Sequence, residues 1–210
     1  MFYLQGEKIQ TQIRESMMKY LVISKTKWNK RNFKNLSKNV KFLNNLNSKV
    51  LKKYNPKIIF FIHWSIFVPK KIYSKYLCIQ FHSSDLPRFR GGSPIQNQII
   101  RGVKKTKITA FKITERIDSG PICLQKKIDL NGSAQTIYER IEKKCLAMIS
   151  LLIKRRNIIF KNQKGKSSFF KRRKPKQSNL KIQKNLNLNK ILDFINMLDA
   201  KNYPKSLYRY

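Results

Sequence analysis

An apolar run that ends in a histidine, followed by a stiff loop, constrains the fold of this chain more than any other feature. Tyr76–Phe81 reads as a buried strand, and His82 stands at its carboxyl end. The next loop is rich in Pro, Gly and Arg, and a helix can begin at Pro94 because proline suits the first helical turn. In α/β proteins, ligands bind where strands end and loops cross into helices. His82 is therefore a candidate for proton transfer at a binding site.

Similar apolar runs along the chain predict a sheet with helices between its strands. The predicted strands are Tyr20–Ile23, Val40–Phe42, Lys57–Ile62, Leu77–Phe81, Lys107–Thr114 and Ile122–Ile128. The predicted helices are Arg31–Asn39, a short one ending before Pro56, Pro94–Arg101, Ala134–Ile153 and Asn189–Leu198. No Gly-x-Gly-x-x-Gly follows the first strand, which argues against a dinucleotide cofactor. We expect an α/β fold with a Rossmann-like, open, mostly parallel sheet and a short C-terminal helical tail.

The loop after His82 resembles the signature of the formyltransferases that use 10-formyltetrahydrofolate. That signature runs Asn-x-His-x-Ser-Leu-Leu-Pro-x-x-Arg-Gly and is followed by a Pro, a helix, a strand and an Asp-x-Gly element. The residues that fall on the pattern are His82, Ser84, Leu86, Pro87, Arg90, Gly91 and Pro94. Asp118, in Ile117–Pro121, matches the downstream element at the separation that the family shows. The resemblance covers roughly Met18 to the C-terminus and implies a sheet of the formyltransferase type.

The resemblance implies three catalytic residues. A protonated His82 would stabilise the oxyanion of formyl transfer and exchange protons, and Asp118 would orient a water or hold the imidazole in its charged form. Gln80 would donate to the oxyanion from its side-chain amide. The implied substrate- and cofactor-binding residues are Ser84, Asp85, Leu86, Pro87, Arg90, Gly91, Gly92 and Ser93. The implied formyl donor is 10-formyltetrahydrofolate, and no metal is expected.

Two positions depart from the family pattern. Gln80 stands where the family has Asn, which moves the amide by on the order of 1.5 Å, and misplacement of that size can cost about 100-fold in rate. Asp85 stands where the family has a Leu that contacts the folate. Either the folate is held differently, or Asp85 meets a cationic or amine substrate.

The charge of the chain is strongly positive. It has 47 Lys and Arg against 10 Asp and Glu, a formal net charge of +37. Two explanations remain open, selected affinity for nucleic acid or compositional drift toward Lys, Asn and Ile, and nonspecific RNA binding is expected under both. Cys78, Cys123 and Cys145 have neither paired spacing nor nearby His pairs, so they are expected to be small buried hydrophobes.

The chain is expected to divide into an N-terminal extension (1–17), a catalytic domain (18–160) and a basic loop with a helical tail (161–210). Met1–Met17 lacks the order of a signal peptide and no apolar run spans a bilayer, so we expect a cytoplasmic protein without a membrane partner. Either Met1 or Met18 could be the start, and the oligomeric state stays open.

The expected function is N-formyl transfer to a primary amine. No segment is long enough for the additional C-terminal barrel by which methionyl-tRNA enzymes of this family grip tRNA. A small-molecule acceptor, such as a nucleotide-linked amino sugar, is therefore preferred. The alternatives are methionyl-tRNA, or a fold disabled at Gln80 and Asp85 that serves as a basic binding protein.

Overall fold

A computed structural model describes residues 20–25, 36, 39–180, 187–201 and 203–206 of the chain. The predicted extension 1–17 and most of the predicted helix Arg31–Asn39 lie outside these residues. Among the described helices, none is both long and apolar enough to cross a membrane.

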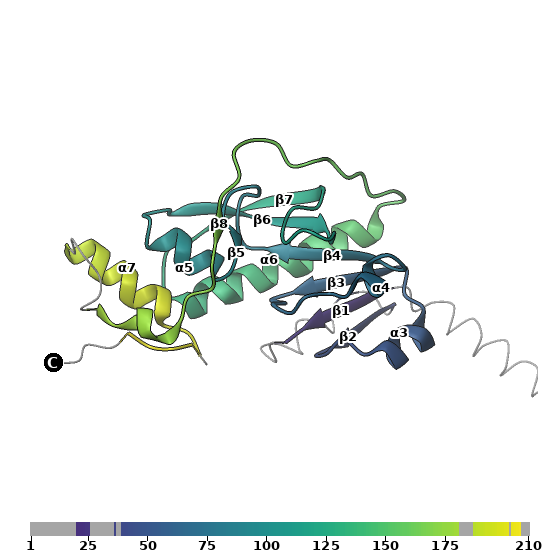
Figure 1. The fold of residues 1–210 in the computed structure, drawn as a ribbon, viewed down its shortest axis with the longest axis horizontal. Helices are drawn as coiled ribbons and strands as arrows, with labels where there is room; N and C mark the ends of the chain where they lie inside the picture. Colours follow the sequence, from purple (N-terminus) through teal and green to yellow (C-terminus); the bar gives the residue numbers. More distant parts are fainter. Residues whose placement is uncertain (1–19, 26–35, 37–38, 181–186, 202, 207–210) are drawn as a thin grey trace, which may run out of the picture.

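The main body is one six-stranded sheet in the order β2-β1-β3-β4-β6-β7 (Figure 1). Its strands are β1 (Tyr20–Ser24), β2 (Val40–Leu43), β3 (Ile58–Ile62), β4 (Leu77–His82), β6 (Lys105–Lys112) and β7 (Ile122–Asp129). β1 runs parallel to β2 and β3, and β3 runs parallel to β4, whereas β6 is antiparallel to both β4 and β7. The α/β class is confirmed and the sheet is mixed. The short connection from β6 to β7 is compatible with an antiparallel pair, because a parallel pair needs a long crossover.

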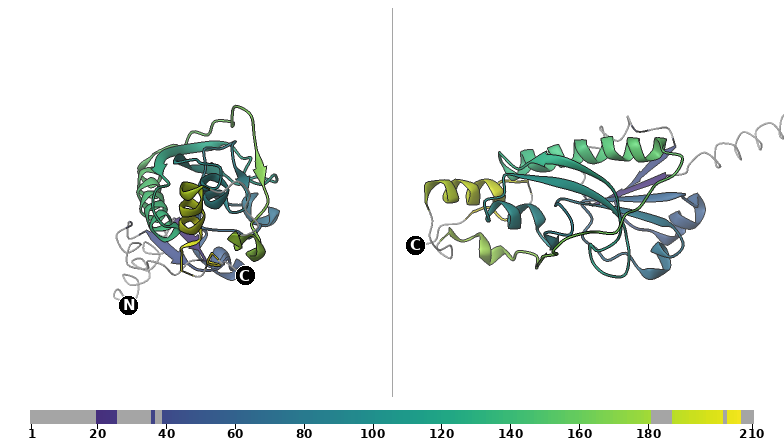
Figure 2. Two further views of the ribbon diagram at one scale, coloured as in Figure 1. Left: turned by 90° about the vertical axis from the view of Figure 1, so that its left-hand side faces the viewer. Right: turned by 90° about the horizontal axis from the view of Figure 1, so that it is seen from above.

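Helices cover both faces of the sheet. They are α3 (Ser48–Tyr54), α4 (Lys70–Tyr73), α5 (Pro94–Ile99), α6 (Ala134–Lys154) and α7 (Leu188–Leu198), with the 3-10 helix η1 (Pro175–Ser178) before α7. Figure 2 shows α6 along one side of the sheet, with α3 and α4 on the other. One face of α6 is a buried apolar stripe, with each of its side chains at most 1% exposed: Ile137, Ile141, Cys145, Met148 and Leu152.

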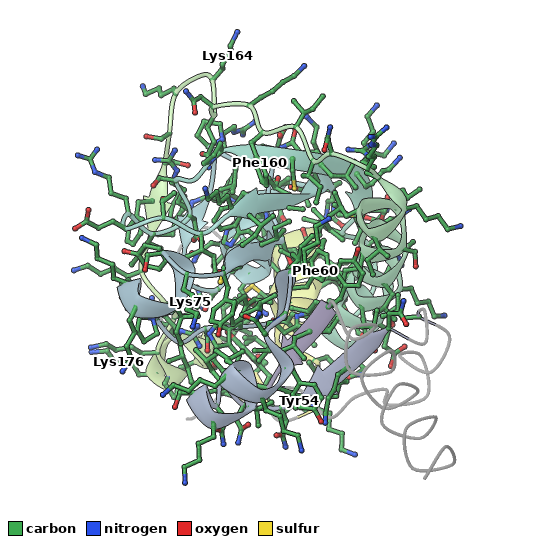
Figure 3. The ribbon with its side chains drawn as sticks, turned by 90° about the vertical axis from the view of Figure 1, so that its right-hand side faces the viewer. Tyr54, Phe60, Lys75, Phe160, Lys164 and Lys176 are labelled. Atoms are coloured by element: carbon green, nitrogen blue, oxygen red, sulfur yellow. The ribbon has the colours of Figure 1, made fainter. Side chains whose placement is uncertain are left out.

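Alternation along β3 places apolar side chains in two separate clusters. Phe60 packs in the cluster that includes the stripe of α6, and Phe61 packs with Leu51 of α3, Ile72 of α4 and Trp64. Burial on both faces explains why β3 is a continuous apolar run, as the sequence predicted. Figure 3 shows Phe60 inside the molecule. Because side chains alternate, Gln80 and His82 of β4 project to the same side of the sheet as Cys78, the side of α3 and α4.

The basic loop predicted at the start of 161–210 forms two sheet pairings. Lys161 makes an isolated antiparallel bridge with Ile122 at the start of β7. Further on, β8 (Phe169–Phe170) pairs in parallel with β5 (Arg90–Gly91), inside the signature loop. Figure 1 shows this segment arching from the end of α6 past β7 and down to β5, with Lys164 pointing outward in Figure 3. The loop after His82 is thus held at β5 by a segment distant in the sequence.

Candidate active site

The loops that follow β3 and β4 open on a pocket of about 1330 Å³. Gln80, His82 and Asp118, the three predicted catalytic residues, all line it. Gly91, Gly92 and Ser93 line it as well, so the pocket joins the strand end to the glycine-containing part of the signature loop. The position fits the rule that ligands of open α/β sheets bind beyond the carboxyl ends of the strands.

His82 is held between two acceptors. Its imidazole is buried, with Nε2 2.7 Å from the carbonyl oxygen of Phe89 and Nδ1 3.6 Å from Oδ2 of Asp118. A neutral imidazole has one N–H, whereas an imidazolium donates from both nitrogens. Both ring nitrogens of His82 thus face an oxygen atom, and a protonated ring at this point of the pocket would place positive charge where an oxyanion could form.

Asp118 occupies a tight turn between β6 and β7. Its backbone is left-handed, with φ of 50°, and its buried carboxylate accepts a hydrogen bond from the backbone N–H of Gly91 over 2.8 Å. Only glycine fits at Gly120, where a Cβ would lie 1.7 Å from the carbonyl oxygen of Lys112. The Asp-Ser-Gly motif thus reflects a turn that presses against β6 and directs Asp118 toward His82.

Gln80 lies two residues before His82 and is half-buried at the pocket. Its amide nitrogen is 3.4 Å from the carbonyl oxygen of Trp64, at the end of the neighbouring strand β3. This long hydrogen bond is weak. The amide is therefore placed to exchange that partner for an oxyanion in the pocket, although its catalytic role stays a prediction.

The remaining predicted binding residues lie outside the lining of the pocket, and their proposed contacts with substrate stay predictions. Ser84 donates to the carbonyl oxygen of Arg88 and is fully buried within the loop. The Asp85 carboxylate is 3.1 Å from Nζ of Lys107 and also accepts from Gln125. Residues without pocket contact are Ser84, Asp85, Leu86, Pro87 and Arg90.

Gln163 is a site residue that the sequence analysis missed. Its side-chain amide donates to the carbonyl oxygens of Asp118 and Gly120 and accepts two hydrogen bonds from the guanidinium of Arg90. A single Gln in a basic segment carries no periodicity or motif that would have marked it. Only the arch of this segment over the sheet brings it to the Asp118 turn.

A second histidine, His63, also lines the pocket, just after β3. Its ring packs edge-on against Tyr138, with the centroids 5.8 Å apart. Burial lowers the pKa of His63 to about 4 and raises the pKa of Tyr138 to about 12. Both side chains are therefore neutral near pH 7, and neither adds charge to the pocket.

The mouth of the pocket is both cationic and apolar. The basic residues that line the pocket are Lys25, Arg116, Lys171, Arg172 and Lys201, against the acidic residues Asp118 and Glu139. The large apolar side chains at the mouth that are more than two fifths exposed are Ile66, Phe67, Ile117 and Phe169. Such a mixture suits a ligand that carries both phosphates and flat aromatic rings.

Within the described ranges, no group of three or more His, Cys, Asp or Glu residues could hold a metal ion. Cys78, Cys123 and Cys145 are free and buried, as the sequence predicted. Burial raises the pKa of Cys78 and of Cys123 to about 12, so these thiols stay protonated.

Comparison with known families identifies the kind of fold and site. A model described as formyl transferase matches residues 9–152, more than half of the chain, and the chain belongs to this family. The match begins within the segment 1–17, while the predicted division into three parts stays a prediction. A second model, described as the C-terminal domain of methionyl-tRNA formyltransferase, matches residues 175–210. The tail of the chain thus resembles a segment of that domain, which weakens the reason for preferring a small acceptor.

Two similar proteins carry the same name. Methionyl-tRNA formyltransferase from Thermodesulfovibrio yellowstonii is 40% identical over 97 residues, which cover 44% of this chain and 32% of that relative. The match thus spans about a third of the length of the curated relative. The solved structure of methionyl-tRNA formyltransferase from Clostridium thermocellum is 39% identical, with a TM-score of 0.83 over 92% of this chain and 88% of that chain.

More distant structures share the fold alone. HypX from Aquifex aeolicus, solved in complex with tetrahydrofolic acid, is 14% identical, with a TM-score of 0.72 over 92% of this chain and 36% of that chain. A sugar N-formyltransferase from Shewanella sp FDAARGOS_354 is 18% identical, with a TM-score of 0.67 over 91% of this chain and 92% of that chain. The amino-sugar acceptor preferred from sequence therefore has only a distant likeness behind it.

Proposed function

We propose that this protein transfers a formyl group from 10-formyltetrahydrofolate to the amino group of methionyl-tRNA. One observation carries the proposal. His82, Asp118 and Gln80 meet on one pocket in a chain that matches a methionyl-tRNA formyltransferase structure over nine tenths of its length. The formyl donor is inferred from the family resemblance, and the fold is also that of a protein solved with tetrahydrofolic acid.

The residues divide the chemistry between them. His82 places its positive charge beside the oxyanion that forms when the amine attacks the formyl carbon, and Gln80 donates a hydrogen bond to that oxyanion. Within the described residues Oδ1 of Asp118 accepts no hydrogen bond, so it can orient a water or the attacking amine. Asp118 then assists transfer of the proton from the attacking nitrogen to the leaving nitrogen.

The charge around the pocket favours a polyanionic acceptor. Five basic side chains line the pocket, against two acidic ones. A tRNA end would meet this surface with its phosphates and would place its terminal bases beside the exposed Phe67 and Phe169. A nucleotide-linked amino sugar carries fewer phosphates and would use less of this surface.

The test is formyl transfer from 10-formyltetrahydrofolate, read by mass spectrometry. The acceptors are methionyl-tRNA and a panel of nucleotide-linked amino sugars, with H82A as the control. We expect formyl-methionyl-tRNA with the wild-type protein and none above background with the variant. Formylation of a sugar in preference to methionyl-tRNA would overturn the acceptor, and folate binding without transfer to any acceptor would overturn the activity.

A further inference from the structure

We propose that Gln163 is a positioning residue that holds the Asp118 turn in its working place, an inference that rests on the proposed function. Gln163 lies on the arching segment and does not line the pocket. It acts on the reaction only through Asp118.

The two ends of the Gln163 amide have different partners. Nε2 donates over 2.9 Å to the carbonyl oxygen of Asp118 and over 2.8 Å to that of Gly120. Oε1 accepts from the guanidinium of Arg90, over 3.2 Å from Nε and 2.7 Å from Nη2. A guanidinium can only donate and a carbonyl oxygen can only accept, so a side-chain amide satisfies both sides at once. These partners also fix which end of the amide is oxygen.

The Asp118 turn needs such a support. Asp118 has a left-handed backbone, which costs free energy in a residue other than glycine unless the surroundings impose it. Gly120 is already pressed against Lys112 on one side. The amide of Gln163 adds hydrogen bonds to the carbonyl oxygens of Asp118 and Gly120, so the turn is held both by this close contact and by the amide.

Gln163 affects His82 indirectly, through the hydrogen bond between Gly91 and the carboxylate of Asp118. Oδ2 of Asp118 accepts from the N–H of Gly91 and lies 3.6 Å from Nδ1 of His82. Arg90, which Gln163 also binds, is the residue before Gly91. Gln163 therefore ties the turn that carries the carboxylate to the strand that carries its N–H donor. Release of this tie would shift Asp118 relative to His82, and a shift of about 1 Å can cost about 100-fold in rate.

The decisive variant is Q163E. It keeps an acceptor for Arg90 but loses both donors and sets a carboxylate against two carbonyl oxygens. We expect kcat to fall by about 10- to 100-fold, with KM for the acceptor nearly unchanged. Q177E is the matched control. Gln177 lies on the same basic segment, and its side-chain oxygen accepts a hydrogen bond from the N–H of Lys174, which a carboxylate can also accept. Q177E should keep wild-type kcat.

Amide hydrogen exchange supplies a readout that does not depend on activity. The N–H of Gly91 donates to Asp118, whereas those of Arg90 and Gly92 donate to the carbonyls of Ser168 and Phe170. In Q163E, the Gly91 amide should exchange faster while the Arg90 and Gly92 amides keep their protection. Unchanged Gly91 protection, or equal acceleration at all three amides, would overturn the positioning role.

A double variant separates positioning from a general effect on the fold. If Gln163 acts through Asp118, Q163E should have little further effect on the residual rate of D118N. Additive losses would overturn the inference. Q163M, which removes both halves of the amide at similar length, provides a second variant should Q163E fail to fold. If the wild-type protein transfers formyl to no acceptor, the proposed function fails, while the exchange of Gly91 still decides the role of Gln163.

Discussion

Two neighbouring strands of the sheet each lead to a histidine, and the two histidines have opposite surroundings. His63 follows β3 and packs against Tyr138, where burial lowers its pKa to about 4. His82 ends β4 between the carbonyl oxygen of Phe89 and the carboxylate of Asp118. Both line the same pocket, so nearness to the pocket does not make a histidine catalytic. The groups around each ring, and not its position alone, distinguish the two histidines.

The largest expected effect comes from removing the charge that distinguishes the two surroundings. D118N keeps the shape of the side chain but leaves His82 without a carboxylate, so its surroundings become closer to those of His63. We expect a loss in kcat on the order of 10²- to 10⁴-fold, the usual range for a group that takes part in proton transfer. Steady-state formyl transfer measures it, and wild-type kcat in D118N would remove Asp118 from the chemistry.

A smaller loss is expected at Gln80, which shares a strand and a face with His82. Q80L removes the amide and should lower kcat by about 10²- to 10³-fold, the typical result of losing one oxyanion donor. Q80N moves the amide to the position that the family uses, and it should retain or exceed wild-type kcat. Equal losses in Q80L and Q80N would mean that Gln80 serves packing and not catalysis.

His63, in contrast, should affect how the free energy of unfolding depends on pH. Because the pKa of folded His63 is about 4, below the ordinary value of about 6.5, the unfolded chain binds the extra proton between these values. The contribution of His63 is fully present above pH 6.5 and is lost as the pH falls toward 4, by on the order of 2–3 kcal/mol.

Urea unfolding from pH 7 to pH 4 tests this expectation. H63F should flatten the pH dependence of the free energy of unfolding in that window, since phenylalanine keeps an aromatic ring against Tyr138 and cannot take up a proton. The same pH dependence in the wild-type protein and in H63F would show that other groups cause it.

The smallest effect is expected from Arg172, a basic residue that lines the pocket. R172A should weaken binding of methionyl-tRNA and reduce the slope of log K against log salt concentration by about 1 if Arg172 contacts a phosphate. Filter binding across a salt series measures the slope. An unchanged slope would place Arg172 outside the contact with the acceptor.

The surroundings of His82 at the end of β4 could largely be predicted from the local sequence. The strand, His82, the loop and the helix at Pro94 are all continuous in the chain, and the Asp118 turn is a recognisable motif, so pattern and resemblance located both. The parallel strand β3 could also be predicted, because it is a continuous apolar run. These features depend on residues close together in the chain, where periodicity and turn chemistry are informative.

What the sequence could not predict depends on contacts between distant segments. Gln163 and β8 reach the signature loop only through the arch after α6, and a basic segment without periodicity gives no sign of it. The antiparallel direction of β6 follows from how the chain crosses the sheet, not from its own residues. Likewise, the engagement of Asp85 with Lys107 and Gln125 could be seen only once β6 and β7 were placed beside the loop.

The most direct test of the account compares H82A with H63A in single-turnover formyl transfer from 10-formyltetrahydrofolate to methionyl-tRNA. The account predicts that H82A loses at least about 10³-fold in rate, whereas H63A loses less than about 10-fold. Equal losses, or a larger loss in H63A, would contradict the claim that the carboxylate beside His82 makes that end of the sheet the catalytic one.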